Sequence, residues 1–336
     1  MQARGGIDLG GTKIEAVVVD ERNRVLGQGR RPTPTEGGPP AVVERIAETV
    51  RIAAEQAGVA PEDLVGVGIG SPGDIDARRG TVGRAHNLPD FEQPFPVAAA
   101  LSEGLGTQVR IGNDVQVAVR GEFELGAGED YASLLGVWWG TGVGGALILG
   151  RKLWLGRGAA GEIGHMVVRR GGIKEAGGSG LRGTLEAYAG RASMEAQARH
   201  AERKGTKTRL FKVMEKRGRT RLTSGVWARA LDEDDKLAHE LVDRAIEALG
   251  VAIASAINLT DVEAVVLGGG LGVRLGPRYL DPLRAEMQTH LFAADRPPDL
   301  HVAALGDLGG AIGAALLFSA RSSARSPASR ARSRAR

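Results

Sequence analysis

The chain has 336 residues, of which 42% are hydrophobic, and it contains no cysteine. This length and apolar content allow a sizeable buried core, in two domains or in one domain built from two lobes. The missing thiols exclude a disulfide framework and a thiolate metal site, which fits a reducing compartment, so we expect a cytoplasmic protein. The apolar stretches are too short to cross a bilayer, and a strand-like run begins by residue 6, so we expect neither a membrane anchor nor an export signal.

The net charge of +4 is concentrated at one end of the chain. Residues 321–336 carry six arginines and no acid, which leaves the rest of the chain at −2. This Arg/Ser segment lacks apolar residues that could pack, so it predicts a disordered tail rather than a nucleic-acid tether. A second basic segment, residues 202–221, has nine Lys or Arg against two Glu, with apolar residues at helical spacing between them. It predicts a solvated helical face.

In chain order, the first 30 residues predict a β-hairpin followed by a third strand, because apolar runs lie on either side of glycine and Asp/Asn turns. A Pro/Gly-rich connector then leads to a helix over 41–58 and a buried strand over 64–70. A short strand over 109–112 ends at Asn113 and Asp114, and a helix follows from Val115. Strands that alternate with helices in this way predict an α/β fold.

The second half of the chain echoes the first. A glycine-rich hairpin over 134–156 repeats the strand, turn and strand of the N-terminus, and a helix over 241–259 precedes a strand that ends in three glycines. The repetition predicts a duplicated fold. We expect an N-terminal lobe of residues 1–112, completed by a C-terminal helix near 307–320, and a C-terminal lobe of residues 113–306.

Two Gly-Thr turns are candidate phosphate sites. Glycine allows tight turns whose backbone N–H groups converge on phosphate oxygens, and Thr adds a hydroxyl donor. A carboxylate just before the first turn suits a hydrated magnesium ion beside those phosphates, although it could equally stabilise the turn. The residues concerned are Gly10, Gly11 and Thr12 in the first turn, Gly140, Thr141 and Gly142 in the second, and the carboxylate of Asp8.

A third glycine pattern is a decoy. Gly68, Gly70 and Gly73 form a G-x-G-x-x-G after a strand, which formally matches a dinucleotide-binding fingerprint. That fingerprint must open a helix, but Pro72 lies inside this one and residues 74–80 have no helical periodicity. We expect a sharp loop here.

Eight motifs together give the chain a family resemblance. They are DLGGTK at 8–13, SPGDID at 71–76, HNLP at 86–89, ND at 113–114, GTGVGG at 140–145, GEIGH at 161–165, LEAYAG at 185–190 and GGG at 268–270. With these motifs the chain resembles the ROK family of bacterial sugar kinases and sugar-responsive repressors. The kinases of that family share a duplicated actin-like, ribonuclease-H-like ATPase fold with two lobes around a cleft.

The resemblance implies where ATP and magnesium bind. Both hairpins and Lys13 would hold the ATP phosphates, and the adenosine would lie near Gly268, Gly269 and Gly270. Sugar hydroxyls would contact a second set of residues, namely Asn87, Asn113, Glu162, His165, Glu186 and Gly73. The family also favours a homodimer.

Asp114 matches the catalytic base of the family. A sugar alcohol is a poor nucleophile at neutral pH, so a carboxylate that accepts its proton as the P–O bond forms is what phosphoryl transfer needs. Asp114 could instead be the N-cap of the helix that follows, and the two roles are compatible. Glu162 and His165 lie three residues apart and could reach one small polar ligand together.

The chain departs from the family at its zinc loop. Gly177, Ser179 and Thr184 stand where the family has three cysteines. We therefore expect no zinc, and a loop held by its own packing and hydrogen bonds, on which the placement of Glu186 depends.

The sequence favours a glucokinase that uses ATP and leaves other functions open. The same fold with polyphosphate as donor is one, because the basic segment could attract it. A sugar-responsive repressor is another, but DLGGTK begins at residue 8 and leaves no room before it for a DNA-binding module. An inactive sugar sensor is a third, which Asp114 and both hairpins oppose. The acceptor could be glucose, mannose, fructose or an N-acetylated hexosamine.

Overall fold

The computed structural model describes residues 2–176 and 180–319. The chain forms two compact units, one that runs to Val117 and resumes at Gly310, and one from Ala118 to Gly309. The predicted tail and the predicted roles of Gly177 and Ser179 lie outside the described residues. None of the helices in the described part combines the length and the apolar character that a bilayer crossing requires.

The first unit is built on a five-stranded sheet in the order β3-β2-β1-β4-β7. The first three strands form an antiparallel meander, and β4 and β7 are added parallel to β1. The strands are β1 (Arg4–Leu9), β2 (Lys13–Val19), β3 (Val25–Pro32), β4 (Val67–Ser71) and β7 (Val109–Asn113). The decoy glycine pattern leads into a small hairpin, β5 (Asp74–Asp76) and β6 (Thr81–Gly83), so the expected loop replaces the helix of a dinucleotide site.

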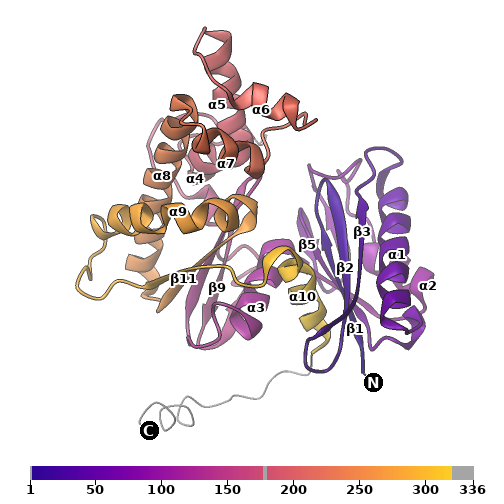
Figure 1. Ribbon diagram of the computed structural model, residues 1–336. Helices are drawn as coiled ribbons and strands as arrows, with labels where there is room; N and C mark the ends of the chain where they lie inside the picture. The colour runs from indigo at the N-terminus through magenta and orange to yellow at the C-terminus, as the bar shows by residue number, and fades with distance from the viewer. Residues whose placement is uncertain (1, 177–179, 320–336) are drawn as a thin grey trace. The chain divides into compact units, whose positions relative to one another are not determined.

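Helices cover both faces of this sheet (Figure 1). On one face, Val42 and Ile46 of the first helix share a buried core with Ile7 and Leu9 of β1. On the other face, a Cβ atom at Gly6 would lie only 2.0 Å from the carbonyl oxygen of Ala311, so the glycine allows the last helix to pack closely. The helical elements of this unit are α1 (Gly38–Ala57), η1 (Pro61–Asp63), α2 (Val97–Leu105), α10 (Gly309–Ala315) and η4 (Leu316–Phe318), and α3 (Asp114–Leu125) begins in this unit and continues into the second.

The second unit repeats the topology of the first. Its sheet has the order β10-β9-β8-β11-β12, with an antiparallel meander followed by two parallel strands. The strands are β8 (Leu134–Trp139), β9 (Val143–Leu149), β10 (Lys152–Trp154), β11 (Ala264–Gly268) and β12 (Asp299–Val302). The predicted α/β duplication is therefore confirmed.

The long, apolar α8 (Lys236–Thr260) of the second unit shares one core with β8 and β11. Asp235 caps α8 by accepting a hydrogen bond from the N–H of Ala238 at 2.8 Å. The other helical elements are η2 (Ile163–His165), α4 (Leu185–Ala189), α5 (Arg191–Arg203), α6 (Leu210–Lys216), α7 (Ser224–Asp232), α9 (Gly269–Gln288) and η3 (Gly306–Leu308).

The basic segment 202–221 is solvated, as predicted, but it is not one helix. It contains the end of α5, a connecting loop and the short α6. Its nine Lys and Arg residues are exposed, whereas its apolar residues Leu210, Phe211, Val213 and Met214 are buried. Asp235 also accepts a hydrogen bond from the hydroxyl of Thr208 at 2.9 Å, which ties the loop to the start of α8.

Candidate active site

In the first unit, the predicted polar residues lie at the carboxyl ends of parallel strands. Asp8 pairs with Gly70 across β1 and β4, and Ser71 pairs with Asn113 across β4 and β7. The carboxyl edge of a parallel sheet is where α/β proteins commonly bind ligands. The register of the sheet therefore brings the end of β1 and the start of α3 to one edge.

The N-terminus of α3 is capped by Asn113. Its Oδ1 atom accepts hydrogen bonds from the N–H groups of Val115 and Gln116, each at 3.1 Å. The interpretation of Asp114 as the N-cap is thus wrong, since α3 already begins at Asp114. Asp114 lies in the first turn, where its Oδ1 accepts from the N–H of Val115 at 2.9 Å. The positive end of the helix dipole stabilises a carboxylate in that turn.

Asp8 is held in an environment that disfavours its charge. Burial, and next the charge of Asp114, raise the pKa of Asp8 to about 7, while Lys13 opposes the shift. Two carboxyl groups that repel each other are stabilised by a cation, and magnesium commonly binds one or two carboxylates together with substrate phosphates. Within residues 2–176 and 180–319, no group of three or more His, Cys, Asp or Glu is placed to hold a metal. The two carboxylates of Asp8 and Asp114 thus fit a metal ion that also binds a phosphate ligand.

The first Gly-Thr turn packs against the predicted sugar loop. The N–H of Gly10 donates to the carbonyl oxygen of Lys13 at 3.0 Å, which closes the turn between β1 and β2. A Cβ atom at Gly11 would lie 2.8 Å from the carbonyl oxygen of Asn87, so only glycine allows this approach. Gly73 adopts a φ of 96°. The ammonium group of Lys13 pairs with the carboxylate of Glu15.

The second Gly-Thr turn is fixed by the start of α5. The N–H of Gly140 donates to the carbonyl oxygen of Gly142 at 2.9 Å. The backbone N–H groups of Arg191 and Ala192 donate to the carbonyl oxygens of Gly140 and Thr141, at 3.1 and 3.0 Å. The guanidinium group of Arg191 also donates to Thr141 Oγ1 at 2.7 Å, and burial lowers the pKa of this arginine. A cation therefore lies beside the turn, at a residue that no sequence motif marked.

The triple glycine lies beside the second turn. Gly268 ends β11 and pairs with Trp138 of β8, so both strands end at the same edge of the sheet. Gly269 has a φ of 78° and begins α9. A Cβ atom at Gly140 would lie 4.0 Å from the nitrogen of Gly270. The second unit therefore gathers Thr141, Gly142 and the three glycines at one edge, as the first unit gathers Asp8 and Asp114.

The remaining predicted sugar residues meet around Glu186. This residue lies in the first turn of α4, and its Oε2 atom accepts a hydrogen bond from the N–H of Val143 at 2.7 Å. A Cβ atom at Gly142 would lie 2.1 Å from the same oxygen, so residue 142 must be glycine for Glu186 to reach β9. Glu162 and His165 lie at the start and end of the short helix η2, and both are exposed.

Hydrogen bonds hold the described residues on either side of positions 177–179, in the segment where the family has its cysteines. Thr184 is the N-cap of α4, where its Oγ1 accepts from the N–H of Ala187 at 3.2 Å. Lys174 and Arg182 form an isolated antiparallel bridge. The hydroxyl of Tyr188 accepts from the N–H of Ile173 at 3.3 Å. These contacts agree with the expectation that packing and hydrogen bonds hold the described part of this loop.

Glu175, which the sequence analysis missed, lies between the predicted sugar residues. Its side chain is only 1% exposed, and its Oε1 atom lies 3.9 Å from Nδ1 of His165. Burial, a hydrogen bond to Glu175 and the charges of Glu175 and Glu162 raise the pKa of Glu186 to about 7. No motif singles out Glu175, because its neighbours in the sequence are unremarkable and its partners come from η2 and α4.

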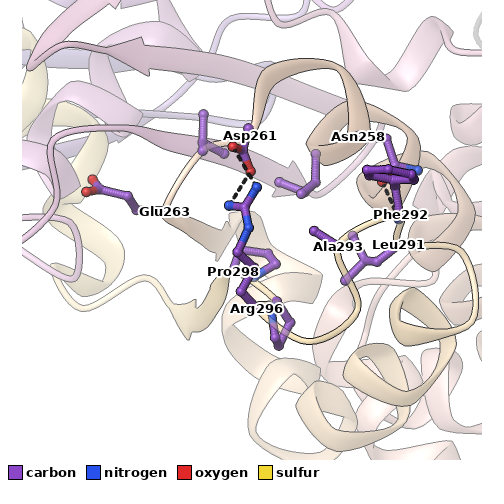
Figure 2. A pocket seen from close by; sticks show the side chains of 11 residues that line it. Asn258, Asp261, Glu263, Leu291, Phe292, Ala293, Arg296 and Pro298 are labelled. Atoms are coloured by element: carbon purple, nitrogen blue, oxygen red, sulfur yellow. Dashed lines mark hydrogen bonds and ion pairs between the residues drawn. The ribbon is translucent and has the colours of Figure 1, made fainter.

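A surface pocket of about 280 Å³ lies elsewhere in the second unit, between the end of α8 and residues 291–298 (Figure 2). Its polar groups are already paired within the chain. Arg296 donates two hydrogen bonds to Asp261 at 2.9 and 3.1 Å, and Asn258 accepts from the N–H of Phe292 at 2.8 Å. None of the predicted site residues lines this pocket. We therefore interpret its paired residues as structural contacts that attach the loop after α9 to the end of α8.

Comparison with known proteins shows similarity along nearly the whole chain. A model of the ROK family matches residues 4–321. The glucokinase of Thermotoga maritima is 32% identical over 291 residues, which cover 85% of this chain and 87% of that protein. An N-acetylgalactosamine kinase of Shewanella sp. is 33% identical over 319 residues, with coverage of 93% and 95%. The crystal structure of a Streptomyces griseus ROK glucokinase with glucose and AMPPNP has a TM-score of 0.79 at 31% identity, with coverage of 94% and 98%.

Proposed function

Because this chain belongs to the ROK family and has its duplicated actin-like, ribonuclease-H-like ATPase fold, we propose that it is a glucokinase-like sugar kinase that transfers the γ-phosphoryl group of ATP to a hexose hydroxyl. The observation that carries the proposal is the proximity of Asp8 to Asp114, whose charge helps to raise the pKa of Asp8, at the carboxyl edge of the first sheet and next to the Gly10–Thr12 turn. Phosphoryl transfer to a hydroxyl needs carboxylates beside a turn that binds the phosphates.

Asp114 acts as the general base in this proposal. The sugar hydroxyl oxygen attacks the γ-phosphorus, its proton passes to the Asp114 carboxylate, and the bond to the β–γ bridging oxygen breaks to release ADP. The cap made by Asn113 supports this role, since it leaves Asp114 in a helical turn rather than in the capping position. The positive end of the helix dipole favours a carboxylate at this position of the helix.

The two Gly-Thr turns hold the phosphates in this proposal. Their backbone N–H groups and the hydroxyls of Thr12 and Thr141 donate to phosphate oxygens, and the guanidinium group of Arg191 adds positive charge at the second turn. Magnesium, held through water by Asp8, would supply further neutralisation of the phosphate charge. The adenosine would bind at Gly268–Gly270.

Glucose is the first candidate acceptor, because the relatives of Thermotoga and Streptomyces are glucokinases. An N-acetylated hexosamine is the second, because the Shewanella relative at 33% identity is an N-acetylgalactosamine kinase. Among the predicted sugar residues, Glu162, His165 and Glu186 supply the mixture of acceptors and donors that sugar hydroxyls require.

A coupled assay of ADP release over a panel of sugars tests the proposal. We expect magnesium-dependent turnover with ATP, with the highest kcat/KM for glucose or an N-acetylhexosamine. A parallel assay with polyphosphate as donor separates the two donors that the basic segment leaves open. Absence of turnover with every sugar and donor, in protein that is folded and loaded with magnesium, would overturn the assignment.

A further inference from the structure

Glu175 is a buried acid between two exposed residues, Lys174 and Ala176. Its side chain is 1% exposed, whereas the side chain of His165, which it faces, is 47% exposed. The N–H of Glu175 donates to the carbonyl oxygen of Leu181 at 3.1 Å, and the neighbouring N–H of Ala176 donates to Ser193 Oγ at 3.2 Å. The backbone around Glu175 is thus fastened on both sides, and its carboxyl group is directed inward at a defined position.

The carboxyl group of Glu175 contacts two elements at once. It is hydrogen-bonded to Glu186 of α4, and its Oε1 lies 3.9 Å from Nδ1 of His165 in η2. The second contact is too long for a hydrogen bond but close enough for electrostatic attraction. Glu186 is held in turn by the N–H of Val143 at 2.7 Å. One buried side chain therefore joins two of the residues that the proposed function assigns to the sugar.

A buried acid is costly unless it is neutralised or hydrogen-bonded. Two adjacent carboxyl groups lower this free-energy cost by sharing one proton, which removes one of the two negative charges. The titratable groups that face the pair are Glu162 and His165, and the backbone of β9 contributes the N–H of Val143. The shared proton fixes the orientation of Glu186, and the remaining negative charge, 3.9 Å from Nδ1 of His165, favours the neutral tautomer of His165 in which Nδ1 carries the hydrogen.

We propose that Glu175 is a positioning residue of the sugar site, which orients the carboxyl group of Glu186 and keeps His165 in the tautomer whose Nε2 accepts a hydrogen bond. The proposal rests on the proposed function, because it assigns these two residues to the sugar. Glu175 does not touch the sugar itself, since its side chain is buried behind them.

The test is the Glu175→Gln variant, which keeps the shape of the side chain and removes its charge. We expect the KM for the sugar to rise about tenfold, with the KM for ATP unchanged, because small displacements of binding groups have effects of this size. We also expect the acid limb of the kcat/KM profile for the sugar to move to lower pH, since removal of the Glu175 charge lowers the pKa of Glu186. Glu175→Asp, which keeps the charge, should retain the wild-type pH profile.

Glu195→Gln is the matched control. Glu195 is also a buried acid of this unit, with 5% exposure of its side chain, but its partners are Arg199 and the N–H of Leu222. It should lose thermal stability and keep the wild-type sugar KM and pH profile. If Glu175→Gln also lost only thermal stability and kept the wild-type sugar KM and pH profile, Glu175 would be only structural and the proposal would be overturned.

A carboxyl-carbon NMR titration of Glu186 provides a readout that needs no turnover. In wild-type protein we expect this titration near pH 7, and in Glu175→Gln at lower pH. An unshifted titration would overturn the positioning role even in a fully active enzyme. A shifted titration in protein that phosphorylates no sugar would instead support the Glu175–Glu186 pairing and contradict the proposed function.

Discussion

Asn113 accepts the hydrogen bonds that cap α3, and Asp114, the next residue, is the first residue of that helix. Adjacent residues with similar side chains thus have separate tasks. The cap fixes where the helix begins, and the helix fixes where the Asp114 carboxylate lies. Substitutions at the two positions should therefore have different consequences.

Asp114→Asn should lower kcat by at least about a hundredfold, because the amide cannot accept the hydroxyl proton and general-base assistance contributes on that scale. Sugar binding and the thermal unfolding temperature should stay near wild type, since Asn113 still caps the helix. Steady-state kinetics and calorimetric sugar titration check both parts. A variant that turns over near the wild-type rate would contradict the role of Asp114 as base.

Asn113→Ala should lower the free energy of unfolding by about 1 kcal/mol, because the N–H of Gln116 loses its acceptor and the N–H of Val115 loses one of its two acceptors. Urea denaturation followed by circular dichroism measures the change. Asn113→Ser is the matched control, since a serine hydroxyl can cap the helix and should recover most of the stability. Equal stability of the Ala and Ser variants would show that the cap contributes little.

Glu122→Ala should be more damaging, although Glu122 belongs to no predicted site. Its buried carboxylate accepts hydrogen bonds from the N–H groups of Ala127, Ala304 and Leu305 at 3.0, 2.9 and 2.8 Å. Alanine would leave these donors without their acceptor, at a cost of about 3 kcal/mol in the free energy of unfolding. Glu124→Gln on the same helix loses only an ion pair with Arg120 and should cost less than about 1 kcal/mol. Similar unfolding energies for the two variants would contradict the anchoring role.

The pH dependence of stability should reveal the raised pKa of Glu186. The folded protein keeps a proton on this residue up to about pH 7, whereas the unfolded chain releases it near 4.5. Between these values the folded state binds more protons, so the contribution of Glu186 to stability is present below about 4.5 and is lost as the pH rises through 7. The stability of Glu186→Gln relative to wild type should therefore increase from pH 4.5 to 7, by on the order of 1 kcal/mol. An unchanged difference across this range would contradict the shift.

Zinc chelation should change neither thermal stability nor activity when magnesium is in excess. The hydroxyl of Thr184, at one of the positions where a relative has cysteine, is already engaged as the cap of α4. Structural zinc is normally held by four nitrogen or sulfur ligands, and its removal couples to unfolding. Near-stoichiometric zinc in elemental analysis of tag-free protein would contradict this expectation.

Local patterns predicted the strands, turns and duplication because each depends on short-range signals. Apolar runs with glycine turns between them mark the two hairpins, and a strand that ends in polar residues before a helix marks the edge that carries Asp114. The choice of cap could not be predicted, since Asn113 and Asp114 are both good capping residues. Arg191 was missed because its partner Thr141 is distant in the sequence, and Glu175 was missed because no motif marks a contact with His165.

The contact between Gly142 and Glu186 links two substitutions that would otherwise be independent. Because a Cβ atom at residue 142 would fall 2.1 Å from Glu186 Oε2, any side chain gained there displaces the carboxylate from the N–H of Val143. In the proposed enzyme, residue 142 lies in a turn that binds the phosphates of ATP, and residue 186 is one of the residues that bind the sugar. A substitution at residue 142 therefore also moves the carboxylate of Glu186, so the two positions do not evolve independently.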